Sequence, residues 1–201
     1  RKGLAFDDPW IGTFHSFSAW LLRREATRLG LPRDFTIYDA DDQTAAVKLA
    51  LEQLNIKDPG ERVRGLLERI SFAKNHALTS AQAATDAARR NDALGITAAK
   101  VYEAYEKILR KSGALDFDDL LLRAVQVLKE FPEASAAWQS RFRYIHVDEY
   151  QDTNRVQYDL LRLLVSESRN LCVVGDEDQS IYRWRGADVG NILRFDEDYS
   201  G

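Results

Sequence analysis

Two short apolar runs, each ending in acidic residues, constrain the fold of this chain more than any other feature. Residues 144–147 lead into Asp148 and Glu149, and residues 171–174 lead through a glycine into Asp176. Apolar runs of this length are consistent with buried strands. Carboxylates that follow parallel strands lie at the edge where open α/β sheets bind their ligands.

The segment between the two runs has the pattern of a helix. Residues 153–168 carry apolar side chains at helical spacing, and Thr153 is a suitable N-cap residue. A strand, a helix and a second strand in this order predict a right-handed βαβ unit with parallel strands. Both acidic strand ends should therefore emerge at the same edge of one sheet.

The two adjacent carboxylates suit different roles. Magnesium prefers hard oxygen ligands and usually takes only one or two of them from protein, which suits Asp148. A second carboxylate one residue further on can activate a water molecule, which suits Glu149 as a general base. The alternative is a charged strand end that faces solvent, because Asp-Glu pairs are common. The apolar run before the pair and the polar residues 151–154 after it favour a functional site.

Aromatic and basic residues follow the second run. Gln179 is followed by Tyr182 and Trp184, and arginines flank the tryptophan at Arg183 and Arg185. Such a mixture suits single-stranded nucleic acid, since bases stack on flat rings. A tryptophan between two arginines would be poorly placed in a core. The segment therefore predicts contacts with a nucleic acid.

Four segments resemble, in order along the chain, motifs of the UvrD/Rep/PcrA type of superfamily 1 DNA helicases. Residues 12–17 (Gly-Thr-Phe-His-Ser-Phe) resemble a DNA-contact motif, and residues 115–121 resemble the acidic-aromatic segment where the chain re-enters the motor domain. Residues 148–154 resemble motif II, with Tyr150 where the family usually has Phe, and residues 175–187 resemble motif III. The resemblance implies an ATP-dependent DNA helicase.

The resemblance also implies roles for the residues around the nucleotide. Asp148 would hold Mg²⁺, and Glu149 would activate the attacking water. Gln151 and Gln179 would lie near the γ-phosphate of ATP, with Gln179 as its sensor.

A second set of residues would contact DNA by the same resemblance. Thr13 and His15 would touch the DNA backbone, while Tyr182 and Trp184 would stack on bases of the translocating strand with Arg185 nearby. Single-stranded and duplex DNA are thus the expected partners, with repair proteins as further candidates. Translocation would run 3′ to 5′, in repair or replication.

The order of expected elements predicts an α/β fold: an incomplete RecA-like P-loop NTPase parallel sheet with an inserted all-helical subdomain. Strands are expected near 10–14, 143–148 and 171–175, and helices at 41–56, 61–75, 80–90 and 96–112. Residues 1–24 and 114–201 would form part of the motor domain, and residues 25–113 the inserted helical subdomain.

Composition adds little about the partner. The net charge of −4 over 201 residues does not by itself suggest DNA binding, so short basic clusters matter more. Cys172 and His146 lie within the apolar runs, which predicts packing rather than redox, metal or catalytic roles. The sequence has neither a signal-peptide pattern nor an apolar stretch of the ~20 residues that a membrane span needs. A cytoplasmic protein, associated with the nucleoid and not with a membrane, is expected.

One part of an ATPase is absent from the sequence. The phosphate-binding pattern G-x-x-x-x-G-K-[ST] does not occur, because Gly60 and Gly65 have its spacing but are followed by two leucines. In the family this loop precedes the segment that resembles residues 12–17. The chain is therefore expected to be part of a longer helicase and to have no ATPase activity alone.

Two alternatives remain. The same motor could drive a separate nuclease domain in a helicase–nuclease subunit. The chain could also belong to a non-catalytic DNA-binding module that lacks the phosphate loop, and a phosphate loop in the parent reading frame would exclude that possibility.

Overall fold

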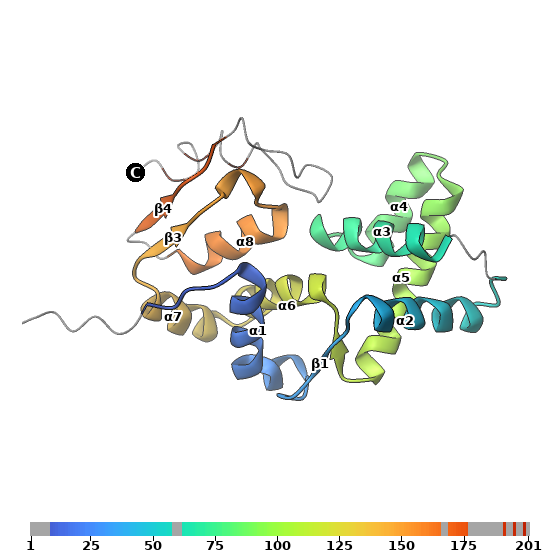
Figure 1. Ribbon diagram of the computed structural model, residues 1–201, viewed down its shortest axis with the longest axis horizontal. Coiled ribbons are helices and arrows are strands. Elements are labelled where there is room, and N and C mark those ends of the chain that lie inside the picture. Colours follow the sequence, from blue (N-terminus) through green and yellow to red (C-terminus); the bar gives the residue numbers. More distant parts are fainter. Residues whose placement is uncertain are drawn as a thin grey trace, which may run out of the picture.

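The computed structural model describes residues 9–57, 62–165 and 169–176, together with Asn191, Phe195 and Tyr199. The described part is mostly helical, with two small parallel sheets (Figure 1). Its helices are α1 (Phe14–Glu25), η1 (Ala26–Leu29), α2 (Ala40–Gln53), α3 (Arg62–Asn75), α4 (Ser80–Arg89), α5 (Ala93–Lys111), α6 (Phe117–Glu130), α7 (Pro132–Arg141), η2 (Tyr150–Asp152) and α8 (Arg155–Leu164). Its strands are β1 (Thr36–Ile37), β2 (Ala114–Leu115), β3 (Ile145–Val147) and β4 (Leu171–Val173).

The predicted βαβ unit is present. Strands β3 and β4 are parallel neighbours, with Ile145 opposite Leu171 and Val147 opposite Val173, and helix α8 connects them. The N-cap of α8 is Asn154, however, and not Thr153 as the sequence suggested. Asn154 and Gln157 form a reciprocal capping box, whereas the hydroxyl of Thr153 donates to the carbonyl oxygen of Tyr150 at 2.7 Å.

The strand expected near residues 10–14 is wrong. Residues 9–13 have no regular structure, and Phe14 already begins α1. The reason is local, because Thr13 caps the helix by accepting a hydrogen bond from the backbone N–H of Ser16 at 3.2 Å. Gly12 permits this entry, since a Cβ atom there would lie 2.6 Å from the Ser16 hydroxyl.

Buried apolar side chains form two main clusters. Helices α1, α6, α7 and α8 share the first, which includes an aromatic group of Phe17, Trp20, Trp138 and Phe142. Helices α2, α3 and α5 share the second, against which Leu78 and Ala83 from the α4 region pack. The parallel pair β1–β2 lies where the chain passes between the two groups of helices (Figure 1).

The free face of the β3–β4 pair differs from the expectation for a buried sheet. His146 and Cys172 lie opposite each other in the register, and both side chains are exposed in the described part of the chain. Their neighbours Leu171 and Val173 instead pack against Val147. Because side chains alternate along a strand, only one face of this pair meets α8, and the packing predicted for His146 and Cys172 is wrong.

No helix among the described residues combines the length and the apolar character needed to cross a membrane.

Candidate functional site

The turn after β3 carries the adjacent carboxylates. Asp148 and Glu149 are both exposed, and the backbone N–H of Glu149 donates to Asp148 Oδ1 at 2.9 Å. Glu149 adopts a left-handed conformation with φ 52° and ψ 42°. This conformation is uncommon for a residue with a side chain and is often found at functional sites. It reverses the chain at the sheet edge, so that the turn η2 follows at once.

Gln151 connects the carboxylate turn to the loop after β4. Its side chain is 1% exposed; its Nε2 donates to Glu149 Oε2 at 2.6 Å, and its Oε1 accepts from the backbone N–H of Asp176 at 3.1 Å. The two contacts fix both the amide orientation and one rotamer of Glu149. Four residues from the two strand ends, Asp148, Glu149, Gln151 and Asp176, thus share one edge of the sheet.

Backbone and side-chain hydrogen bonds of Tyr150 and Thr153 stabilise the turn. Tyr150 is fully buried, and its backbone N–H donates to the carbonyl oxygen of Val174 at 2.9 Å. The carbonyl oxygen of Tyr150 accepts both the N–H and the hydroxyl of Thr153. Burial, together with the nearby Glu149 carboxylate, raises the pKa of Asp152. The exposed carboxylates therefore stand on a rigid, internally bonded support.

The carboxylates at this edge suit a cation that takes most of its ligands from water and substrate. No group of three or more His, Cys, Asp or Glu side chains in the described ranges could hold a metal. Asp148 offers a single exposed carboxylate, which matches the way Mg²⁺ binds through one or two carboxylates and the phosphates of a substrate. The residues present therefore fit a magnesium–nucleotide complex and do not fit an all-protein metal cage.

Thr13 and His15 lie at the start of α1, whose first turn contains no acidic residue. Phe14, between them, packs against the cluster that contains Val147 and Tyr150. The helix start is therefore coupled by packing to the strand and turn that carry the carboxylates. Free N–H groups at such a helix start favour anions, including phosphate.

Phe117 is an addition that the sequence did not single out. It is 54% exposed at the start of α6, and its ring centroid lies 4.8 Å from that of His15. Burial lowers the pKa of His15, so its imidazole is neutral at neutral pH. The sequence did contain a signal for an exposed ring at this position. Phe117 stands between Asp116 and Asp118, and an aromatic residue between two acids is poorly placed for a core.

Comparison with known proteins identifies the family. Residues 2–200 match the model of the UvrD/REP helicase N-terminal domain. The chain belongs to this family. Two relatives, each described as ATP-dependent DNA helicase PcrA, come from Staphylococcus epidermidis and Staphylococcus aureus. Each is 46% identical over 190 residues, which is 94% of this chain and 26% of the relative. The chain thus spans about a quarter of the length of these helicases.

The remaining site residues expected from the sequence are Gln179, Tyr182, Trp184 and Arg185, and they lie outside the described residues.

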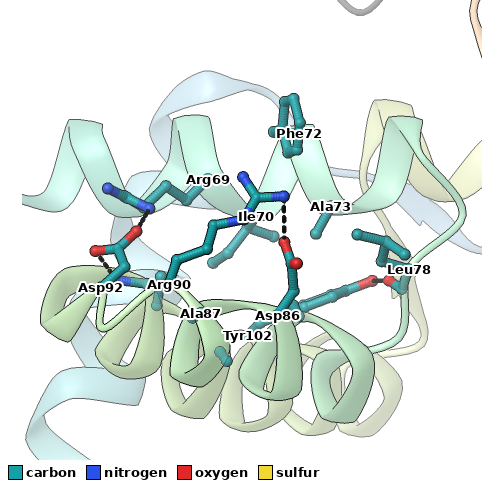
Figure 2. A pocket seen from close by; sticks show the side chains of 14 residues that line it. Arg69, Ile70, Phe72, Ala73, Leu78, Asp86, Ala87, Arg90, Asp92 and Tyr102 are labelled. Atoms are coloured by element: carbon teal, nitrogen blue, oxygen red, sulfur yellow. Dashed lines mark hydrogen bonds and ion pairs between the residues drawn. The ribbon is translucent and has the colours of Figure 1, made fainter.

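A small hollow of about 100 Å³ lies apart from the carboxylate turn, between α3 and the α4–α5 pair (Figure 2). Ile70, Ala87 and Tyr102 are among its lining residues. The ion pairs Arg69–Asp92 and Asp86–Arg90 lie at its rim (Figure 2). Its charges are already paired with each other, and it holds no nucleophile or exposed carboxylate pair of the kind found after β3.

Proposed function

We propose that this chain is part of the first motor domain of an ATP-dependent DNA helicase that moves 3′ to 5′ on single-stranded DNA. The observation that carries the proposal is the turn after β3, where Asp148 and Glu149 are exposed and buried Gln151 holds the Glu149 carboxylate. Membership of the UvrD/REP helicase family supports the reaction class. The protein would act in the cytoplasm at the nucleoid, in DNA repair or replication.

In this proposal the two carboxylates divide the work. Asp148 would hold the Mg²⁺ that accompanies ATP, which would supply positive charge beside the phosphates. Glu149 accepts a proton from the attacking water. Gln151 keeps the Glu149 carboxylate in one rotamer through its 2.6 Å hydrogen bond, and it would lie near the γ-phosphate. Gln179 would sense that phosphate from the following loop.

The DNA-binding face combines the start of α1 with the start of α6. Thr13 and the free N–H groups of the first helical turn would meet the phosphate backbone. A neutral His15 can donate one hydrogen bond to the same backbone. Exposed Phe117 beside it offers a flat ring for a base, as Tyr182 and Trp184 would with Arg185.

We also propose that residues 1–24 and 114–201 belong to the RecA-like motor domain and residues 25–113 to an inserted helical subdomain. Two separate apolar clusters support the division, because α2, α3 and α5 bury their faces against each other. Phe35 falls within the range of the subdomain but packs in the cluster of α1 and α6, so the residues around strand β1 connect the two units.

The test of the proposed function is Glu149→Gln in the full-length helicase. The substitution keeps the side-chain shape and leaves Asp148 in place, so ATP binding should persist. Loss of the general base should slow DNA-stimulated hydrolysis by about 10²–10⁴-fold. Glu68→Gln, an exposed position in α3, is the matched control and should hydrolyse ATP at the wild-type rate. Wild-type turnover in the Glu149 variant would refute the assigned role.

A second measurement addresses the 201 residues alone. They contain no G-x-x-x-x-G-K-[ST] sequence, and we expect no ATP hydrolysis even with saturating single-stranded DNA and Mg²⁺. Weak, salt-sensitive DNA binding should survive, because phosphate contacts do not need ATP. DNA-stimulated turnover that Glu149→Gln abolishes would mean that these residues contain another phosphate site.

A further inference from the structure

A polar seam joins the last turn of α3 to the starts of α6 and α8. Lys74 in α3 is fully buried, with its Nζ 2.6 Å from Asp116 Oδ2 and 2.9 Å from Asp119 Oδ1. Tyr105 Oη donates to the same Asp116 oxygen at 2.9 Å. In Figure 1 one end of α3 points toward α6 and α8. The seam therefore fixes this end of α3 against α6.

Asn75 extends the seam to the turn that carries the carboxylates. Its Nδ2 donates to Asp118 Oδ1 at 2.9 Å and to the carbonyl oxygen of Ser71 at 2.9 Å. These two acceptors leave Asn75 Oδ1 facing α8, where it accepts from Asn154 Nδ2 at 2.5 Å. The orientation of the Asn75 amide is thus determined by its partners.

Asn154 links the position of α3 to the turn that carries the carboxylates. It directly follows Thr153, whose two hydrogen bonds to the Tyr150 carbonyl oxygen close the turn that begins at Glu149. Its Oδ1 accepts from the Gln157 N–H at 2.9 Å, and its side chain is 7% exposed. The side chain of Asn154 therefore both caps α8 and contacts Asn75 of α3, one residue beyond the turn that Thr153 closes.

We propose that Asn75 is a positioning residue for hydrolysis. Through its contact with Asn154 it fixes the turn that begins at Glu149, so the position of that turn depends on the position of α3. The proposal rests on the function proposed above. Asn75 does not touch the nucleotide. It restrains the C-terminal end of the turn, while the carbonyl oxygen of Val174, directly after β4, restrains the turn at Tyr150. Small displacements of a catalytic group are costly for rate, so a loose support should slow the chemical step more than it weakens binding.

The experiment compares two substitutions that break the same contact from opposite sides. Asn75→Ala removes the acceptor and also the Nδ2 donor to Asp118 and Ser71. Asn154→Ser retains a good N-cap for α8 but removes the amide donor. In the full-length helicase, each should lower kcat of DNA-stimulated hydrolysis by about 3- to 10-fold, as expected for one hydrogen bond. The KM for ATP should stay within about twofold, because binding is not the affected step.

The double variant separates coupling from independent damage. If the two side chains act through one contact, Asn75→Ala with Asn154→Ser should be no slower than the slower single variant. Rates that multiply would overturn the proposal. Ile70→Val is the control for general loosening of α3, since Ile70 is buried in the second cluster and is not part of the seam. An equal loss of kcat in this control at a matched shift in Tm would also overturn the proposal.

Failure of this inference is distinguishable from failure of the proposed function. Glu149→Gln is measured in the same assay. If it abolishes hydrolysis while both asparagine variants turn over at the wild-type rate, the helicase function stands and the positioning role is wrong. If wild-type protein shows no DNA-stimulated hydrolysis, or Glu149→Gln leaves it unchanged, the proposed function itself fails.

Discussion

Carboxylates occupy two turns of this chain, residues 116–119 and residues 148–152, and their surroundings are opposite. Asp116 and Asp119 are buried against Lys74, whereas Asp148 and Glu149 are exposed at a strand end. The first turn opens α6 through a capping box of Asp116 and Asp119, whereas the second forms η2 and precedes the capping box of α8. The two turns therefore differ both in local backbone structure and in the partners of their acids.

The acids of the first turn stabilise the fold, whereas those of the second are available to a ligand. In the first turn the acids meet an ammonium group from α3, 42 residues before Asp116, and a tyrosine hydroxyl from the preceding helix α5. In the second turn the only described side-chain partner of Glu149 is Gln151, which supports one carboxylate oxygen without neutralising it. Substitutions in the first turn should thus affect stability, and substitutions in the second should affect chemistry.

The largest effect on stability is expected for Lys74→Met. The change keeps most of the apolar stem but leaves Asp116 and Asp119 buried without their cation, which should cost about 3–5 kcal/mol in the free energy of unfolding. Urea unfolding of the 201-residue chain measures the loss. Glu149→Gln, the matched change at the exposed turn, should stay within about 0.5 kcal/mol of the wild type.

Neutralising the acids should reverse the loss. Lys74→Met combined with Asp116→Asn and Asp119→Asn removes the unpaired charges, and Asn remains a good N-cap for α6. Burial raises the pKa of Asp119, so the deficit of the single variant should also shrink as the pH is lowered and this carboxyl takes up a proton. A Lys74→Met chain with unchanged stability would mean that the cluster does not hold α3 in place.

The sequence predicted the second turn better than the first. The βαβ unit and its paired acids follow from local periodicity and from the order of the elements, and both are present. The helices expected from residue 41 to residue 112 are also present, with ends shifted by a few residues. Such features depend on neighbours in the chain, which the sequence displays directly.

Long-range polar pairing could not be predicted in the same way. Lys74 is 42 residues from Asp116, and Asn75 is 79 residues from Asn154, so no local pattern marks either pair. The left-handed backbone of Glu149 and the exposure of Cys172 likewise depend on how the strands meet the rest of the structure. The local pattern also did not distinguish a strand at residues 10–14 from an irregular segment that leads into α1. A helix N-cap and a short strand both have extended backbone.

Phe117 tests whether the first turn also contains a functional group. Its side chain is largely exposed, unlike the buried Asp116 before it, and its ring contacts His15. Phe117→Ala in the full-length helicase should weaken single-stranded DNA binding by about 1–3 kcal/mol, the usual worth of one base stack. Phe72→Ala is the control, because Phe72 in α3 is 56% exposed and stacks on His76, directly after that helix. Equal DNA affinity in the Phe117 variant and the wild type would place the ring outside the DNA-binding face.

The smallest expected effect concerns the pH dependence of His15, which lies beside this ring. Burial lowers the pKa of His15 in the folded chain below its ordinary value of 6.5, so the unfolded chain binds this proton more tightly. Stability should therefore decline slightly as the pH falls through 6.5 toward the folded pKa, and it should be unaffected by this group at higher pH. Urea unfolding between those values should show the decline in the wild type. His15→Gln should remove it, while His146→Gln, at an exposed ring, should retain it. An unchanged decline in His15→Gln would assign the proton to another group, and the neutral imidazole proposed for the DNA-binding face would lose its support.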